Sequence, residues 1–227
     1  MKKPSFIDSF SQKVDVDSSD TVLVVIDMQN ATGNRNMGLG KLLSEAGKAE
    51  QSDFRFSRIE QMLVPNIQKL LASFRDNNAG IIYITYGAET PDARDVPPHL
   101  KPIVVATNNI VGNIEHEIVA DLTPHSGELV FNKTTQGAFR STKIDTALRA
   151  MNAKTVVCVG VSTNNCVAMT AMEACDSQYK VVIVSDATGT DSQEMQDSTL
   201  TMLGRLWSRV MTTDEVVEHI SAYHLEM

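Results

Sequence analysis

Five short apolar runs, each followed by a longer amphipathic stretch, constrain the fold of this chain more than any other feature. The runs are Thr21–Ile26, Gly80–Thr85, Glu128–Phe131, Thr155–Val161 and Lys180–Ser185, with a weaker sixth run at Arg209–Thr212. Most of them are rich in Val and Ile and do not alternate between apolar and polar residues. This pattern is typical of parallel strands that are covered on both faces.

Apolar residues recur every three or four positions between these runs, which predicts helices. The predicted helices are Arg58–Asn77, Lys143–Met151, Val167–Ser177, Ser192–Trp207 and Thr213–Ala222. Alternating strands and helices with short connections predict a single-domain, doubly wound α/β/α sandwich with a mostly parallel sheet of about six strands. We expect this domain to occupy residues 21–227, after an N-terminal extension over residues 1–20.

Two segments interrupt the alternation of strands and helices. Ala31–Ser57 is rich in Gly, Asn and charged residues, and Gly87–Leu122 contains the Pro-rich stretch PDARDVPPHLKP. Each follows the carboxyl end of a predicted strand. Loops of this length in a compact domain are usually functional or disordered, so we expect both to lie over one rim of the sheet.

Composition excludes several classes of partner. Twenty basic residues against twenty-eight acidic ones give a formal net charge of −8, which argues against a nucleic-acid or anionic-membrane surface. The apolar runs are too short to span a membrane, and the N-terminus has no secretory signal pattern. Three cysteines without metal-ligand spacing indicate reduced thiols in a cytoplasmic protein.

Three chemically active side chains follow predicted strands at their carboxyl ends. Asp27 ends the first strand, Lys133 follows the third and Cys166 follows the fourth, at or near the start of a helix. Because the carboxyl ends of parallel strands share one edge, we expect a carboxylate, an ammonium and a thiol to meet in one crevice. Each residue alone has an ordinary structural explanation, but three together indicate a site.

Three sequence blocks carry a resemblance to a known family. They are VVIDMQN (24–30), NKTTQGAF (132–139) and GVSTNNCVAMTAMEACDSQYKVVIVSDATG (160–189). On these blocks, over roughly residues 20–212, the chain resembles the isochorismatase-like cysteine hydrolase superfamily. That superfamily includes nicotinamidases, N-carbamoylsarcosine amidases, and ureidoacrylate and biuret hydrolases.

The resemblance implies a catalytic triad in which Asp27 is the general acid and base, Lys133 the charge partner and Cys166 the nucleophile. It also implies a cis peptide between Val161 and Ser162, and an oxyanion hole formed by the backbone N–H groups of Ser162 and Cys166. A helix N-terminus and an ammonium both lower the pKa of a nearby thiol, so we expect a lowered pKa for Cys166. We further expect the three side chains to lie at the rim and not in the core, so that substitutions there leave folding little affected.

The chain departs from the family's metal-dependent members. Nicotinamidases bind a metal through Asp-x-His after the second strand, whereas this strand exits as Thr85-Tyr-Gly-Ala-Glu89, and the five histidines show no ligand spacing. We therefore expect no metal and no cofactor. Further rim residues are candidates for substrate contact: Gln29, Tyr86, Glu89, Arg94, Phe139 and Asn165. For Glu89 and Arg94 the competing interpretation is a solvated loop charge, and for Phe139 it is core packing.

These observations predict a cysteine-dependent amidohydrolase that cleaves a C–N bond of a small amide, ureide or carbamoyl compound through an acyl-enzyme. One alternative is an isochorismatase-like hydrolase that cleaves a vinyl ether or another non-amide bond. The other is a catalytically silent oligomeric module. We expect a small-molecule substrate as partner, no nucleic acid or membrane, and a homo-oligomer, either a dimer or a tetramer.

Overall fold

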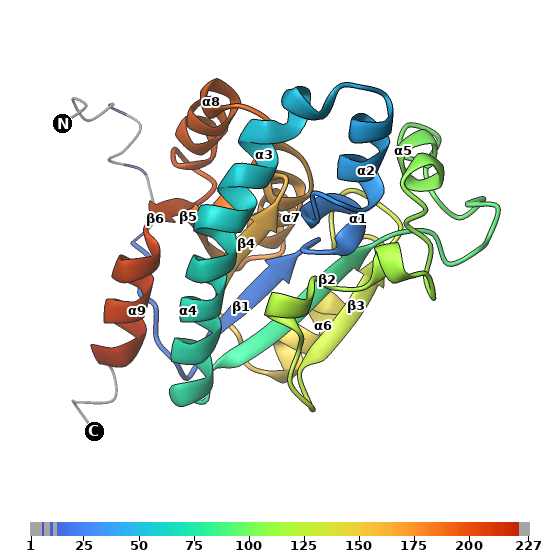
Figure 1. Cartoon of the computed structure of the whole chain (residues 1–227). Helices are drawn as coiled ribbons and strands as arrows, with labels where there is room; N and C mark the ends of the chain where they lie inside the picture. The colour runs from blue at the N-terminus through green and yellow to red at the C-terminus, as the bar shows by residue number, and fades with distance from the viewer. Residues whose placement is uncertain (1–5, 7–9, 11–12, 223–227) are drawn as a thin grey trace.

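A six-stranded parallel sheet forms the centre of the molecule (Figure 1). We describe it in a computed structural model, which describes residues 6, 10 and 13–222. The strands are β1 (Thr21–Ile26), β2 (Gly80–Tyr86), β3 (Leu129–Lys133), β4 (Thr155–Val161), β5 (Lys180–Gly189) and β6 (Arg209–Met211). Their order is β3-β2-β1-β4-β5-β6, and every pairing is parallel. The predicted sheet is confirmed, and the order reverses between β1 and β4.

Helices cover both faces of the sheet. On one face, α4 (Val64–Asp76) and α9 (Thr213–Ala222) pack against alternate strand residues such as Leu23 and Val157. The other face holds α6 (Ile144–Ala150), α7 (Ala168–Asp176) and α8 (Gln193–Leu203), packed against the intervening strand residues. Strands with two buried faces need apolar residues at every position, which explains why the runs do not alternate. The doubly wound α/β/α sandwich is therefore confirmed.

Two strands extend at least two residues further than their apolar runs. β3 ends at Lys133, where the sequence predicted an end at residue 131, and β5 continues to Gly189. The extra residues are polar or small, and an apolar pattern does not detect them. Lys133 consequently belongs to the sheet itself, and its side chain is fully buried.

The segment 31–57 is helical, which corrects the prediction of an irregular loop. It contains α1 (Asn30–Gly33), α2 (Gly38–Glu45), a 3₁₀ turn (Ala49–Ser52) and α3 (Asp53–Arg58). A π-helical turn then joins α3 to α4, so that one helical run covers residues 53–76 where the sequence predicted a start at 58. The reason is that Phe56, Ile59 and Leu63 continue the apolar face of α4 and are all buried.

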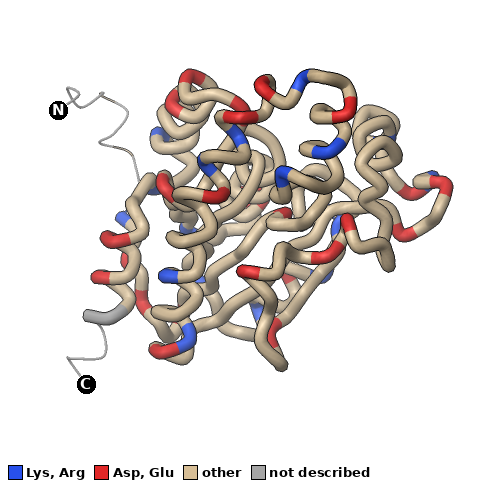
Figure 2. The backbone as a smooth tube through the Cα atoms, viewed as in Figure 1, with Lys and Arg blue, Asp and Glu red and all other residues tan. Residues whose placement is uncertain are grey.

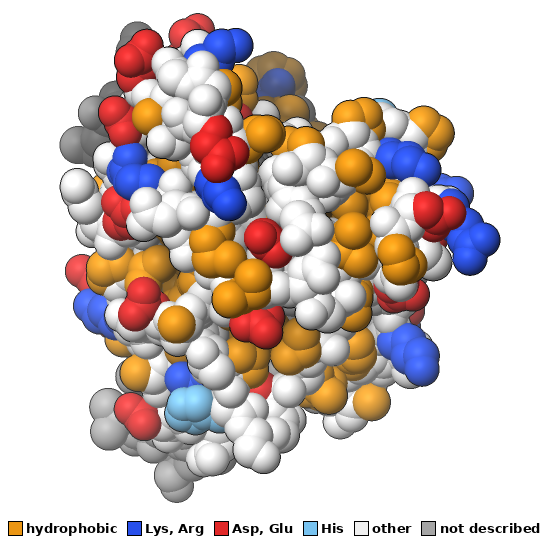
Figure 3. All heavy atoms as spheres, turned by 45° about the vertical axis from the view of Figure 1, so that its right-hand side comes forward, with side chains coloured by type: hydrophobic (Ala, Val, Ile, Leu, Met, Phe, Trp, Pro, Cys, Tyr) orange, Lys and Arg blue, Asp and Glu red, His pale blue; other side chains and the backbone are white. Residues whose placement is uncertain are grey.

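The segment 87–122 also has structure of its own. It includes α5 (Lys101–Ala106) and two 3₁₀ turns, Ile114–His116 and Ala120–Leu122. A small apolar cluster forms beneath it from Tyr86, Ala88, Ala93, Val96 and Val104. Figure 3 turns this side of the molecule forward and shows hydrophobic atoms on its surface. Exposed apolar side chains of the segment are Ile103, Val105, Val111 and Ile114.

Further predictions from the sequence concern the N-terminal extension, the distribution of charge and membrane-spanning helices. Half of the predicted extension over residues 1–20 lies outside the described residues, and Val16, which is described, is buried in the core cluster. Over the described part of the chain, Lys and Arg are interspersed with Asp and Glu (Figure 2). No described helix is long and apolar enough to cross a membrane. Oligomeric state and cytoplasmic location stay predictions.

Candidate active site

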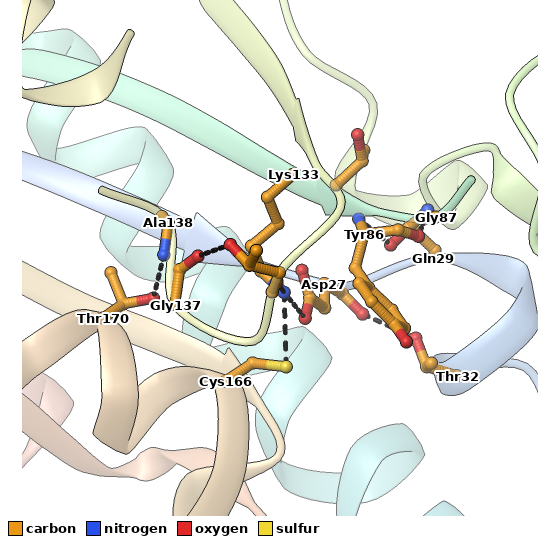
Figure 4. Close-up of polar contacts among 12 residues, drawn as sticks. Asp27, Gln29, Thr32, Tyr86, Gly87, Lys133, Gly137, Ala138, Cys166 and Thr170 are labelled. Atoms are coloured by element: carbon orange, nitrogen blue, oxygen red, sulfur yellow. Dashed lines mark hydrogen bonds and ion pairs between the residues drawn. The ribbon is translucent and has the colours of Figure 1, made fainter. Parts of the chain in front are cut away.

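The predicted carboxylate, ammonium and thiol meet at the carboxyl edge of the sheet (Figure 4). Lys133 Nζ lies 3.0 Å from Asp27 Oδ2 and donates a hydrogen bond to Cys166 Sγ at 3.3 Å. Asp27 directly follows β1, Lys133 ends β3 and Cys166 lies in the turn after β4, so the sheet topology brings the three together. Lys133 thus contacts both other groups at once.

Asp27 leaves β1 in an unusual backbone conformation. Its φ is +53°, in the left-handed region that residues other than Gly rarely adopt. Its N–H donates to Ile84 O on the neighbouring strand, and its side chain is 3% exposed. Oδ2 pairs with Lys133, whereas Oδ1 is buried without a hydrogen-bond partner among the described residues.

The backbone of β4 passes very close to β1 just before Asp27. Gly160 pairs with Ile26 in the register, and its φ is +109°. A Cβ built on Gly160 would lie 2.0 Å from Ile26 O, a backbone atom that cannot move aside. Only glycine fits here, and this close approach places the exits of β1 and β4 side by side.

Lys133 is enclosed on every side. Its side chain is 0% exposed, Nζ also donates to Thr135 O at 3.2 Å, and Nζ lies 4.4 Å from the centre of the Tyr86 ring. A buried ammonium is stable only when it is paired and hydrogen-bonded, and these contacts meet that need. The prediction that the site lies at the rim and not in the core is wrong, because Asp27 and Lys133 are core residues.

Cys166 lies in a π-helical turn, Thr163–Val167, which runs directly into α7. The peptide bond between Val161 and Ser162, at the start of this turn, is cis. Ser162 O accepts hydrogen bonds from the N–H groups of Asn165 (3.0 Å) and Val167 (3.2 Å). The N–H of Cys166, which lies between these two donors in the described turn, does not donate to Ser162 O.

The surroundings of Cys166, taken together, oppose ionisation of its thiol. Burial raises the pKa of Cys166, and the neighbouring Asp27 carboxylate adds to the effect, so that the pKa reaches about 12 despite the ammonium of Lys133. The predicted lowering of this pKa is therefore wrong. Burial also raises the pKa of Asp27, against the opposing attraction of Lys133. Burial disfavours the Lys133 ammonium, but the charges of Asp27 and Cys166 outweigh it and raise the pKa of Lys133.

Two of the predicted substrate-contact residues, Gln29 and Tyr86, are buried. Gln29 Nε2 donates to Tyr86 O, Asn109 Oδ1 and His116 O, and its Oε1 accepts from the Tyr86 N–H. The fold therefore uses the whole amide of Gln29 to hold the 87–122 segment, which corrects its assignment to substrate. Tyr86 differs, because its hydroxyl is buried with no partner among the described residues.

The other four predicted contact residues have different surroundings, and none of their hydrogen bonds, ion pairs or ring contacts within the described part of the chain reaches Asp27, Lys133 or Cys166. Glu89 is exposed and accepts a 3.4 Å hydrogen bond from Asn132 Nδ2. Arg94 is exposed, with 76% of its side chain accessible, and its Nε lies 3.7 Å from Asp92 Oδ1. Phe139 is partly buried, and it packs against the Tyr179 ring at the side of a core cluster. Asn165 is exposed on the turn before Cys166.

Sequence reasoning missed three residues near the site. Thr135, two positions after Lys133 in the NKTTQGAF block, supplies the carbonyl that holds the ammonium. His116 bonds to Asn132 Oδ1 at 2.9 Å through Nε2. Arg55 reaches the turn of Cys166 from α3, and no sequence signal connects them. Among the described residues, no three His, Cys, Asp or Glu side chains could together hold a metal ion.

Comparisons with known proteins agree with this fold. The family profile described as Isochorismatase domain matches residues 21–215. Ureidoacrylate amidohydrolase RutB of Variovorax paradoxus is 24% identical over 199 residues, covering 82% of this chain and 75% of that protein.

Two solved structures are also similar. A cysteine hydrolase from Pseudomonas syringae pv. phaseolicola 1448A superposes with a TM-score of 0.75 at 24% identity, covering 98% of this chain and 100% of the other. N-carbamoylsarcosine amidase from Thermoplasma acidophilum superposes with a TM-score of 0.63 at 22% identity, covering 86% and 97%. These likenesses show the fold.

Proposed function

Because this chain belongs to the isochorismatase family of hydrolases, we propose that it cleaves a C–N bond of a small amide, ureide or carbamoyl compound with Cys166 as nucleophile. The observation that carries the proposal is the position of Lys133 Nζ, 3.0 Å from Asp27 Oδ2 and 3.3 Å from Cys166 Sγ. The RutB and N-carbamoylsarcosine amidase relatives, by their names, act on C–N bonds of this kind.

The first step couples attack to proton transfer. With a pKa of about 12, the Cys166 thiol is protonated at neutral pH. Its proton passes to Asp27 as sulfur forms a bond to the substrate carbonyl carbon, and the raised pKa of Asp27 makes it a better base for this task. Lys133 stays charged and stabilises whichever neighbour is negative.

The oxyanion forms next to the start of α7. In this proposal the N–H groups of Ser162 and Cys166 donate to it, and preorganised donors of this kind are worth on the order of 10²–10³ in rate. Asp27 returns its proton to the substrate nitrogen, the C–N bond breaks, and ammonia or an amine leaves. The acyl group then remains on Cys166 as a thioester.

Water completes the cycle. It attacks the thioester carbon and gives a proton to Asp27, and the second intermediate collapses to release a carboxylic or carbamic acid. The proton on Asp27 returns to the Cys166 sulfur. Asp27 Oδ1, which is buried with no hydrogen-bond partner among the described residues, is an acceptor suited to the N–H of the substrate in the first half and to water in the second.

A screen for ammonia release tests the proposal. Small primary amides, ureides and N-carbamoyl amino acids are incubated with the wild type and with Cys166→Ala, and a vinyl ether is included. We expect at least one amide-type compound to be hydrolysed by the wild type alone. Hydrolysis that persists in Cys166→Ala, or turnover of the vinyl ether alone, would contradict the thiol mechanism.

A further inference from the structure

A buried arginine on α3 reaches the turn that carries Cys166. Arg55 is 5% exposed. Its Nη1 donates to Ser162 Oγ at 2.8 Å and to Asp191 Oδ1 at 3.0 Å. Nη2 and Nε both donate to Thr32 O, at 3.0 and 3.2 Å. One guanidinium therefore binds three separate segments.

Each of these segments leaves a different strand at the site edge of the sheet. Thr32 follows β1, and its hydroxyl donates to Asp27 O at 2.7 Å. Ser162 follows β4 and directly precedes the turn that carries Cys166. Asp191 follows β5. Arg55 thus connects the segment after β1, which carries Asp27, to the segment after β4, which carries Cys166. It has no hydrogen bond to either of these two described side chains.

The shape of the guanidinium makes this connection rigid. Its five N–H donors lie in one plane at fixed angles, so its acceptors are held in a fixed relative arrangement. Lysine would supply a charge of similar reach but could not hold three acceptors in one plane. Hydrogen-bond networks in a buried setting also fix conformation more strongly than exposed ones.

We propose that Arg55 is a positioning residue that holds the Ser162 side of the oxyanion site in place. The inference rests on the proposed function, in which the Ser162 N–H binds the oxyanion. A displacement of about 1 Å at a reacting centre costs on the order of 10² in rate. Arg55 should therefore matter for reactions that pass through an oxyanion and not for those that only need the thiol.

Two probes separate these requirements. With 4-nitrophenyl acetate, the Cys166 sulfur bonds to the acetyl carbon, the thiol proton goes to Asp27, and 4-nitrophenolate leaves after an oxyanion has formed. With iodoacetamide, the thiol proton also goes to Asp27, the sulfur bonds to the methylene carbon as iodide leaves, and no oxyanion forms. The ratio of the acylation rate to the alkylation rate at Cys166 therefore reports how well the oxyanion site stabilises the oxyanion.

The test compares Arg55→Lys with Arg58→Lys. Arg58 lies on the same helix and donates to Thr188 O (3.0 Å) and Ser185 O (2.8 Å), but has no bond to the turn of Cys166. We expect Arg55→Lys to slow acylation about tenfold to a hundredfold with alkylation within twofold of the wild type. Arg58→Lys should leave the ratio of the two rates unchanged.

Ser162→Ala provides a second route if Arg55→Lys fails to fold. It removes the hydroxyl that Arg55 binds and keeps the backbone N–H, so acylation should fall, and the double variant should be no slower than Arg55→Lys. Equal losses in acylation and alkylation, or an unchanged ratio in both variants, would overturn the positioning role. Absence of acylation in the wild type would instead refute the proposed nucleophile.

Discussion

Substituting Lys133 by methionine should destabilise the whole protein, although the residue lies in a candidate active site. Methionine matches the length of lysine and leaves the buried Asp27 carboxylate without its partner. Removing one member of a buried ion pair costs about 3–5 kcal/mol of unfolding free energy. Each kcal/mol shifts Tm by about 2–4 °C for a chain of this size, so we expect Tm to fall by about 6–20 °C at pH 7.5.

The loss should depend on pH in a defined direction. Burial already raises the pKa of Asp27 while Lys133 is present, and removing the ammonium raises it further. Between the unfolded and folded pKa values the native state holds a proton that the unfolded state has released. Stability of the variant therefore decreases as pH rises through that window and is recovered toward pH 5.

Thermal unfolding followed by near-ultraviolet circular dichroism from pH 5.0 to 8.5 measures this effect. The double variant Asp27→Asn/Lys133→Met is the matched control, because it contains neither buried charge and should be more stable at pH 7.5 than the single variant. A Tm for Lys133→Met within 2 °C of the wild type, or a loss that does not vary with pH, would refute the argument that this pair is buried and coupled.

Three further outcomes are expected. Iodoacetamide should alkylate Cys166 before the fully buried Cys158, as followed by peptide mass mapping. The alkylation rate of Cys166 should rise about tenfold per pH unit from pH 7 to 9, because the pKa of its thiol is about 12. A plateau of this rate by pH 8 would contradict the prediction. Tyr86→Phe removes a hydroxyl that has no partner among the described residues, so it should lower kcat/KM without lowering Tm. Tyr83→Phe removes an acceptor of Arg75, so it should lower Tm alone. Hydrolysis should continue after exhaustive chelation. Loss of hydrolysis on chelation, followed by its recovery when metal is added back, would show that a metal takes part.

The sequence predicted most of the sheet and the meeting of the three site residues, for one physical reason. Strands covered on both faces must be apolar throughout, and the carboxyl ends of parallel strands share an edge, so residues that follow the runs converge. Asp27 and Cys166 could be placed in this way without knowledge of their contacts. For Lys133 the predicted edge of the sheet is correct, but the residue is buried in the core and not exposed at the rim.

What the sequence could not predict depends on contacts between distant segments. The burial of Lys133 requires Tyr86 and Thr135 to enclose it, and neither residue type indicates burial of a charge. Gln29 looked suited to bind substrate because it is polar and follows Asp27, yet its partners come from a segment 57 to 87 positions away. Arg55 escaped notice for the same reason, since its partners lie 23 to 136 positions away.

The close approach at Gly160 has a consequence for how variation in this chain should be interpreted. In a saturation scan, position 160 should accept no substitution, because any Cβ would collide with the Ile26 carbonyl. Gly127 also has a positive φ but has nothing within 4 Å of a built Cβ, so asparagine or aspartate should survive there. An alignment of descendants would show Gly160 as invariant as Cys166. That invariance would record the space between two backbones and not a chemical role.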